Sequence, residues 1–114
     1  FPDLTIHPVI ADIRNYQRIS SIFRENHPDV VFHTAAHKHV PLMEMNPEDA
    51  VTNNIVGTRC LVDAAMKHEV EKFVLISTDK AIRPINIMGA TKRIAEMIVL
   101  NAANQCDGFM SRFL

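Results

Sequence analysis

Four polar residues directly follow an apolar run in the middle of the chain. The run covers residues 73–76, and Ser77, Thr78, Asp79 and Lys80 come after it. A short run rich in β-branched and aromatic residues is typical of a buried strand. Ligands bind at the carboxyl ends of strands in open parallel α/β sheets, so a hydroxyl, a carboxylate and an amine there indicate a reaction centre. A polar strand exit closed by an Asx-type turn is the alternative.

A lysine on the next predicted helix is placed to join this group. A loop that contains Pro84 leads to a helical pattern that starts near Ile87. Met88 and Lys92 are four residues apart, and residues at i and i+4 lie on the same face of a helix. We therefore expect Lys92 to point in the same direction as Met88.

Both motifs resemble the extended short-chain dehydrogenase/reductases. Within these they are most similar to the CapD-like polysaccharide-biosynthesis group, the nucleotide-sugar 4,6-dehydratases that act on UDP-N-acetylglucosamine. The matching segments are STDKA at 77–81 and MGATKR at 88–93. The wider superfamily has Tyr-x-x-x-Lys, and Met88 stands at the tyrosine position. Longer members of the CapD-like group share this departure, so it supports the resemblance.

The resemblance implies a three-stage reaction on a UDP-sugar. A hydride leaves C4 for NAD or NADP, water is eliminated across C5 and C6, and the hydride returns to C6. Thr78 would hydrogen-bond near the C4 oxygen, and Asp79 would be the general acid for the C6 hydroxyl. Lys80 would be the base for the C5 proton, which requires a pKa lowered by burial or nearby positive charge. Met88 cannot transfer a proton, so Asp79, Lys80 and water remain alternatives for the C4 proton.

The resemblance also implies a set of cofactor-binding residues: Asp12, Ile13, Ala35, Ala36, Asn54 and Lys92. Asp12 would contact the adenine, and Lys92 would bind the nicotinamide ribose. Asn54 belongs to an Asn-x-x-Gly-Thr motif and would support the active site from within a helix. Spacing alone also allows a turn residue at Asp12 and a solvated helix face at Asn54.

Three histidines occur within seven residues, which suggests a metal site. They are His33, His37 and His39, and no cysteine or paired carboxylate completes a recognisable ligand spacing. The segment AAHKHVP at 35–41 matches the CapD-like group, which favours a loop beside the substrate or cofactor. We expect no metal site, and a histidine-based metal protein is an alternative class.

Hydrophobic periodicity predicts alternating strands and helices. Strands are expected at 8–11, within 29–36, at 73–76 and from 109, and helices at 15–26, 46–68 and 87–105. The connections are long enough for parallel crossovers, which predicts an α/β fold with a Rossmann-like, doubly wound parallel sheet. On the last helix we expect Ile94 to be buried and Glu96 to be exposed.

The glycines limit how much of this fold the chain contains. Gly57, Gly89 and Gly108 form no glycine-rich turn of the kind that holds a pyrophosphate. We therefore expect residues 1–114 to be a partial NAD(P)-binding Rossmann-like domain, a central fragment without the first βαβ unit. In the resembled family two strands separate those that correspond to 8–11 and 29–36. Either the whole chain is longer, or the strands of this fragment are rearranged, or another chain supplies the edge of the sheet.

Composition bounds the remaining classes. The chain is 47% hydrophobic and 22% charged with a net charge of −1, which is typical of one soluble globular unit and not of a nucleic-acid surface. No apolar run is long enough to span a bilayer, and Cys60 and Cys106 are typical of free thiols in a reducing compartment. We expect a cytoplasmic homo-oligomer, or attachment to the cytoplasmic face of the inner membrane through a segment outside this chain.

These observations predict a nucleotide-sugar 4,6-dehydratase, a lyase of the UDP-N-acetylglucosamine class. It would form a 4-keto-6-deoxy sugar nucleotide for surface polysaccharide or glycan biosynthesis, and the 114-residue chain alone is expected to be inactive. A nucleotide-sugar epimerase of the same fold is one alternative. An inactive nucleotide-binding or interaction module is another.

Overall fold

The computed structural model describes residues 3–34, 51–77, 87–105 and 108–113. Its helices and strands follow one another along the chain in this order: α1 (Tyr16–Asn26), β1 (Val30–His33), η1 (Val51–Val56), α4 (Gly57–Lys67), β2 (Lys72–Ser77), α5 (Ile87–Ala103) and β3 (Phe109–Phe113). The segment η1 is a π-helix that leads directly into α4. Strands and helices therefore alternate, as the periodicity predicts.

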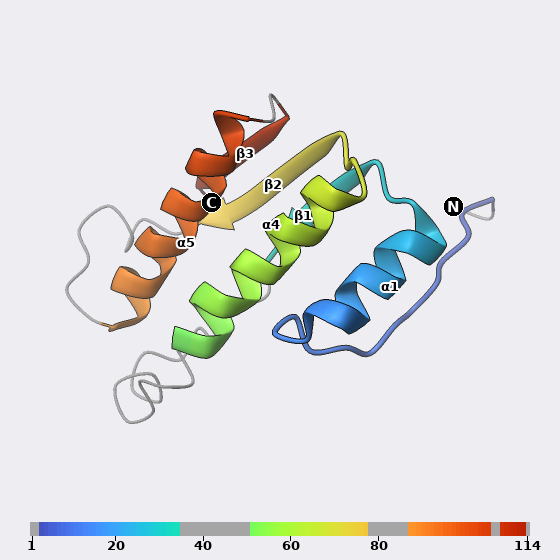
Figure 1. Cartoon of the computed structure of the whole chain (residues 1–114), viewed down its shortest axis with the longest axis horizontal. Coiled ribbons are helices and arrows are strands. Elements are labelled where there is room, and N and C mark those ends of the chain that lie inside the picture. Colours follow the sequence, from blue (N-terminus) through green and yellow to red (C-terminus); the bar gives the residue numbers. More distant parts are fainter. Residues whose placement is uncertain (1–2, 35–50, 78–86, 106–107, 114) are drawn as a thin grey trace.

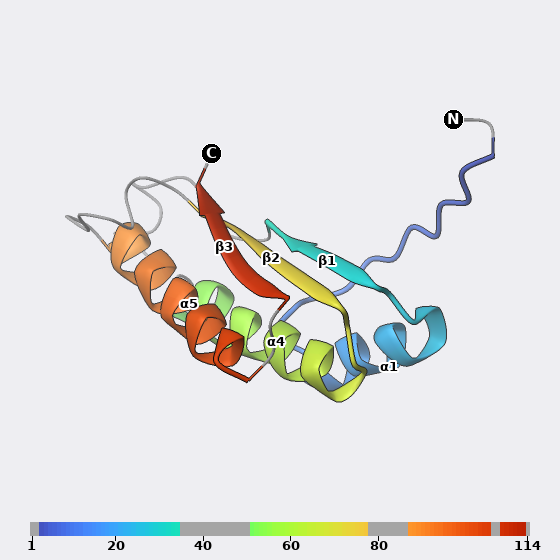
Figure 2. The same ribbon diagram turned by 90° about the horizontal axis from the view of Figure 1, so that it is seen from above.

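The three strands form one parallel sheet in the order β1-β2-β3. Val31 is opposite Phe73, which in turn is opposite Phe109. Parallel neighbours need a crossover connection, and each one here contains a helix. The helices α1, α4 and α5 all lie on the same face of the sheet (Figures 1 and 2). The predicted α/β class with a parallel sheet is confirmed.

The core lies between the sheet and these helices. Its buried apolar side chains come from the three α-helices, from β2 and β3, and from the turn before β2: Ile19, Phe23, Leu61, Val62, Ala64, Ala65, Val70, Phe73, Leu75, Ala95, Val99, Ala102 and Phe109. Phe73 stacks on Phe109 with ring centroids 5.3 Å apart, and His33 meets Phe73 edge-on at 6.2 Å. These three rings, one from each strand, are thus in contact along the face of the sheet that the helices cover.

Strand β1 alternates between the two faces of the sheet. Val31 packs against the core and His33 is buried, whereas Val30 is exposed and the Phe32 ring is 68% exposed. Successive side chains of a strand point to opposite faces, so the exposed pair lies on the face away from the helices. None of the described helices covers that face (Figure 2).

Helix α1 begins and ends where the sequence predicts. The side chain of Asn15 accepts a hydrogen bond from the backbone N–H of Arg18 at 3.1 Å, which caps the helix start. His27 has a φ of 48°, a left-handed conformation that ends the helix before Pro28. Ile19 and Phe23, four residues apart on this helix, are buried in the core.

The predicted strand at 8–11 is wrong. The segment forms no strand, and Ile10 is fully exposed. A strand is stable only when a neighbour accepts and donates its backbone hydrogen bonds, and no described strand lies beside this segment. The turn that was expected after it is present, with the backbone N–H of Asn15 donating to the carbonyl of Asp12 at 3.0 Å.

The predicted buried face of α5 is partly wrong. Ile94 is exposed, and Glu96, which was expected to be exposed, has a side chain only 2% exposed. Ala95 and Val99 form the centre of the buried face, so Glu96 lies on its edge and Ile94 lies outside it. The small side chain of Ala95 allows the helix to approach its neighbours closely, and the Glu96 carboxylate accepts from Arg93 Nη1 at 3.0 Å.

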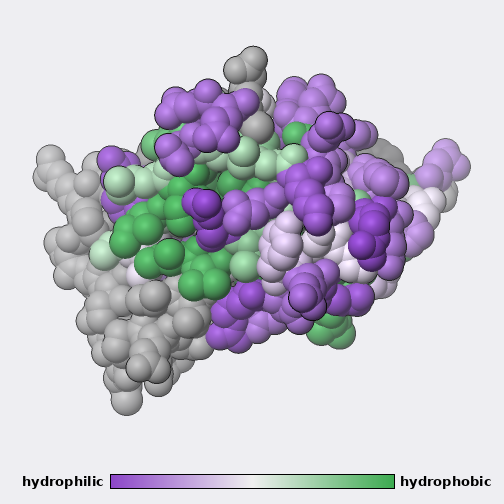
Figure 3. All heavy atoms as spheres, viewed as in Figure 1, coloured by the Kyte–Doolittle hydropathy of each residue, from purple (hydrophilic) through white to green (hydrophobic). Residues whose placement is uncertain are grey.

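An apolar patch lies on the outer surface of α5 and its surroundings (Figure 3). Ile94, Met97 and Leu100 are the exposed large apolar residues of this helix. Within the described residues, no helix is both long enough and apolar enough to cross a membrane.

Candidate functional site

The predicted site residues divide into those that the structure describes and those that it does not. The reaction-centre residues Thr78, Asp79 and Lys80, together with Ala35 and Ala36, lie outside the described residues. Met88 lies in α5, and its side chain is also outside the description. Four predicted cofactor-binding residues are described, namely Asp12, Ile13, Asn54 and Lys92. These four belong to two clusters near the start of α4.

The first cluster is a line of buried hydrogen bonds that joins β1 to α5. His33, the last residue of β1, lies 2.9 Å from Thr58 Oγ1 through its Nε2 atom. The Thr58 hydroxyl donates to the backbone carbonyl of Asn54 at 2.7 Å, and Asn54 Nδ2 donates to Thr91 Oγ1 at 2.6 Å. All four residues are buried. We call this set the polar line.

The proton count along the polar line fixes the tautomer of His33. Thr58 uses its only hydroxyl proton on the Asn54 carbonyl, so it can only accept from His33. His33 therefore has its proton on Nε2 and a lone pair on Nδ1. The Nδ1 atom and the Oδ1 atom of Asn54 are buried and have no hydrogen-bond partner among the residues that the structure describes.

Lys92 brings a positive charge to the same place. It follows Thr91 directly, and only 6% of its surface is exposed. Burial first, and the charge of Lys92 second, lower the pKa of His33 from 6.5 to about 4. His33 is therefore neutral at neutral pH. The carboxyl end of β1 thus holds a buried, neutral histidine that is close enough to Lys92 for the lysine charge to lower its pKa.

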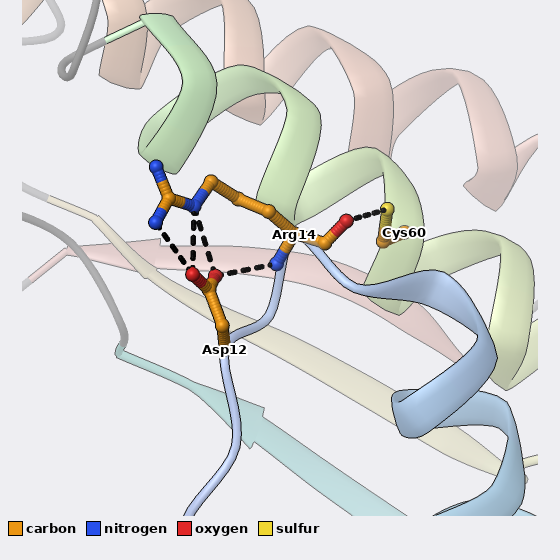
Figure 4. Close-up of polar contacts among 3 residues, drawn as sticks. All are labelled: Asp12, Arg14 and Cys60. Carbon is orange, nitrogen blue, oxygen red and sulfur yellow. Dashed lines mark hydrogen bonds and ion pairs between the residues drawn. The ribbon is translucent and has the colours of Figure 1, made fainter.

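The second cluster centres on Asp12, which lies in the turn before α1. Arg14 donates from Nε to both carboxylate oxygens of Asp12, at 2.9 and 3.0 Å, and from its backbone N–H at 2.9 Å (Figure 4). These bonds, the side-chain ones first, lower the pKa of Asp12 from 3.8 to about 2. The carboxylate is consequently ionised at any physiological pH, and it remains 48% exposed toward solvent.

Two contacts attach this cluster to α4. A Cβ atom at Gly57 would clash with the end of the Ile13 side chain, so the present position of that side chain depends on the glycine. Cys60, a free thiol, donates from Sγ to the backbone carbonyl of Arg14 at 3.5 Å (Figure 4). Burial raises the pKa of the Cys60 thiol, with smaller contributions from Asp63 and Asp12.

Sequence reasoning did not assign His33, Thr58 or Thr91 to the site. His33 was considered only as a metal ligand, and its proposed companions His37 and His39 lie outside the described residues. Two signals were available in the sequence. His33 is two residues after Val31, and side chains two residues apart in a strand point to the same face, which here is the face of β1 that the helices cover. Thr58 lies four residues after Asn54 and so shares its helix face.

The fold and these buried polar groups define the class of protein. A parallel α/β sheet with a buried lysine at the carboxyl end of a strand has the arrangement of a Rossmann-like ligand-binding domain. A family described as "Polysaccharide biosynthesis protein" matches residues 2–114. The chain belongs to this family, which confirms the resemblance found in the sequence.

Three curated relatives are similar to most of this chain. The capsular polysaccharide biosynthesis protein CapD of Staphylococcus aureus is 55% identical over 91% of this chain and 18% of that protein. A UDP-N-acetylglucosamine 4,6-dehydratase (inverting) of Campylobacter jejuni is 38% identical over 91% of this chain and 30% of its own length. A UDP-glucose 4-epimerase of Rickettsia akari is 40% identical over 86% and 28%, respectively. The chain therefore spans less than a third of each relative.

Solved structures have the same fold. The X-ray structure of Pen from Bacillus thuringiensis matches with a TM-score of 0.81 and 42% identity, over 92% of this chain and 32% of that one. UDP-glucose 4-epimerase from Brucella ovis in complex with NAD matches with a TM-score of 0.81 and 25% identity, over 92% and 36%. Both agree with the predicted Rossmann-like fold, of which this chain contains only a part.

Proposed function

We propose that this chain contains the reaction centre of a nucleotide-sugar 4,6-dehydratase of the UDP-N-acetylglucosamine class. The observation that supports this most strongly is the burial of Lys92, whose chain neighbour Thr91 accepts a hydrogen bond from Asn54, in a chain 38% identical to a dehydratase of that class. The STDK motif at 77–80 and the methionine at position 88 support the same assignment. The product would be a 4-keto-6-deoxy sugar nucleotide for polysaccharide or glycan biosynthesis.

The described residues fit a nicotinamide dinucleotide. Its ribose hydroxyls and adenine amino group are hydrogen-bond donors, and the structure provides a buried free acceptor at Asn54 and an exposed carboxylate at Asp12. Lys92 and Asn54 would hold the nicotinamide ribose, and Asp12 with Ile13 would hold the adenine. When bound, the dinucleotide would supply the hydride acceptor and donor of the reaction. The NAD complex of the Brucella ovis epimerase supports this choice.

The roles of the remaining residues follow from their chemistry. Thr78 hydrogen-bonds near the C4 oxygen, and Lys80 removes the C5 proton as its neutral amine. Asp79 donates a proton to the departing C6 hydroxyl, which leaves as water. The positive charge of buried Lys92 is proposed to lower the pKa of Lys80 and so to favour its neutral form.

A nucleotide-sugar epimerase is the second candidate function. The 40% identity to the Rickettsia akari UDP-glucose 4-epimerase favours it, and it would use the same dinucleotide site and the same oxidation at C4. The product distinguishes the two reactions. An epimer keeps the mass of the substrate, whereas the dehydratase product has lost one water.

The test uses the intact protein with UDP-N-acetylglucosamine and follows the sugar nucleotide by mass spectrometry. We expect loss of one water in the wild type and no loss in Lys80→Ala or Asp79→Asn, because each lacks one proton-transfer group. Lys67→Ala is the matched control, since Lys67 is exposed at the far end of α4. Wild-type turnover in Lys80→Ala would remove the role of Lys80, and an unchanged mass with inverted configuration would favour the epimerase.

We also propose that the protein binds a UDP-sugar and self-associates. The exposed apolar patch of Ile94, Met97 and Leu100 on α5 supports self-association, because burying such side chains against a second copy is favourable. Sedimentation of the wild type and Met97→Lys would test it. We expect the charged variant to be the smaller species, and equal sizes would count against this face.

A further inference from the structure

His33 is the one member of the polar line that belongs to the sheet. Its ring is 2% exposed, rests edge-on against Phe73 at 6.2 Å and donates from Nε2 to Thr58 at 2.9 Å. A buried ring with two such contacts has little freedom to rotate. His33 is thus a fixed point at the end of β1 from which the polar line starts.

The polar line transmits that fixed position to α5. If the Thr58 side chain rotated away, its oxygen could no longer accept from His33 and its hydroxyl could no longer donate to the Asn54 carbonyl. Asn54 in turn holds Thr91, and Thr91 is the neighbour of Lys92 in the chain. Each bond is buried, so water cannot easily replace a lost partner.

We propose that His33 is a positioning residue for Lys92 in the dinucleotide site. Through Thr58 and Asn54 it sets the distance between the end of β1 and the first turns of α5. This inference rests on the proposed function, because it concerns the same site. The positioning role requires the Nε2–H group of His33 as a hydrogen-bond donor. The neutral ring supplies this donor without adding a charge next to Lys92.

Three substitutions separate the features of the histidine. His33→Gln retains an N–H donor close to the position of Nε2, because a glutamine amide reaches about as far as that atom. His33→Asn has a shorter side chain, which keeps an acceptor near the position of Nδ1 but cannot reach Thr58. His33→Phe keeps a ring against Phe73 and removes both nitrogens.

The chain offers a matched control in His68, which ends α4. His68 Nε2 lies 2.8 Å from Ser20 Oγ, and its ring meets Phe23 edge-on at 6.4 Å. It therefore makes the same two kinds of contact as His33, but at the other end of the helix and away from Lys92. His68→Gln and His68→Phe change the same chemistry outside the site.

The experiment measures the affinity of the intact protein for NAD⁺ and for NADP⁺ in all five variants. We expect His33→Phe and His33→Asn to bind the preferred dinucleotide about tenfold more weakly than the wild type, and His33→Gln to restore most of the loss. Both His68 variants should bind like the wild type. Wild-type affinity in His33→Phe overturns the proposal, and so does a folded His33→Gln that is as weak as His33→Phe.

Hydrogen exchange in the dinucleotide-free protein provides a second readout. We expect the backbone amides around Thr91 and Lys92 to exchange faster in His33→Asn than in His33→Gln, with no such difference for the His68 variants. Equal exchange in the two His33 variants overturns the positioning role. If the wild type binds neither dinucleotide, the proposed function fails at that point, while the exchange result still decides whether His33 positions α5.

Discussion

Helix α4 has a histidine–hydroxyl pair at each end, and the two pairs behave differently. At its start Thr58 accepts from His33, and after its last residue His68 meets Ser20. Each histidine also lies edge-on to a phenylalanine ring. The pairs thus share their chemistry but not their surroundings.

Burial and charge make the difference. The His33 pair is buried beside Lys92, and its hydroxyl is committed to a further partner, the Asn54 carbonyl. The His68 ring is only half-buried, and the pair joins α4 to α1 far from the predicted site residues. The same pair of groups thus links two helices at one end of α4, and at the other end it joins β1 to α4 in a buried place that feels the charge of Lys92. The two histidines differ in position, because His33 ends a strand of the sheet whereas His68 follows the last residue of a helix.

Acidification should give the largest difference between the two pairs. The pKa of His33 is lowered from 6.5 to about 4 in the folded state, so the unfolded chain takes up a proton at a higher pH than the folded protein does. The contribution of neutral His33 to the free energy of unfolding is fully present above pH 6.5 and is lost as the pH falls toward 4. The loss is about 3 kcal/mol.

Chemical denaturation of the dinucleotide-free intact protein between pH 7 and pH 4 measures this loss. His33→Gln does not titrate, so its stability should fall by less than that of the wild type over this range. Parallel curves for wild type and variant would show that His33 takes up its proton equally well in the folded state.

Removing the hydroxyl of Thr58 should give the next largest effect. Valine has the same shape, so Thr58→Val leaves the packing intact but leaves the Nε2–H group of His33 without an acceptor. A buried donor without a partner costs about 1–3 kcal/mol. The free energy of unfolding from urea titration checks this, and a loss below about 0.5 kcal/mol would mean that water reaches the site.

Removing the hydroxyl of Ser20 should give the smallest effect. The His68 ring is half-buried, so solvent can satisfy it after Ser20→Ala. Alanine also favours the helix more than serine does, which offsets part of the lost bond. We expect a change below about 1 kcal/mol in the same urea titration. A loss as large as that of Thr58→Val would remove the distinction between the two ends.

Local patterns predict the elements of this fold well, because each one has a local physical cause. The Asn15 cap and the residues before Pro28 set the bounds of α1, and the apolar run at 73–76 marks the core of β2. The strand expected at 8–11 failed because a strand depends on its neighbours. Periodicity records the preference of the segment but not the presence of a partner.

The site was harder to predict than the fold. Asn54 and Lys92 were found through a family resemblance, and the structure brings both to the carboxyl end of β1. Glu96 was expected in solvent because it is charged. Its position on the helix, at the edge of the buried face, was given less weight. His33 was judged by its neighbours in the sequence, whereas its role depends on Thr58, 25 residues away. Hydrogen bonds between residues so far apart in the chain produce no local pattern by which a single sequence could reveal them.

The most direct test of the account is the dinucleotide affinity of the intact protein with Lys92 replaced by methionine. Methionine keeps most of the buried apolar stem and removes the ammonium group, and Lys67→Met at the exposed end of α4 is the control. Thermal unfolding of each variant verifies that it is folded. We predict that Lys92→Met binds NAD⁺ and NADP⁺ at least about tenfold more weakly, while Lys67→Met binds like the wild type. Equal affinity in both variants would contradict the account, because buried Lys92 would then not belong to a dinucleotide site.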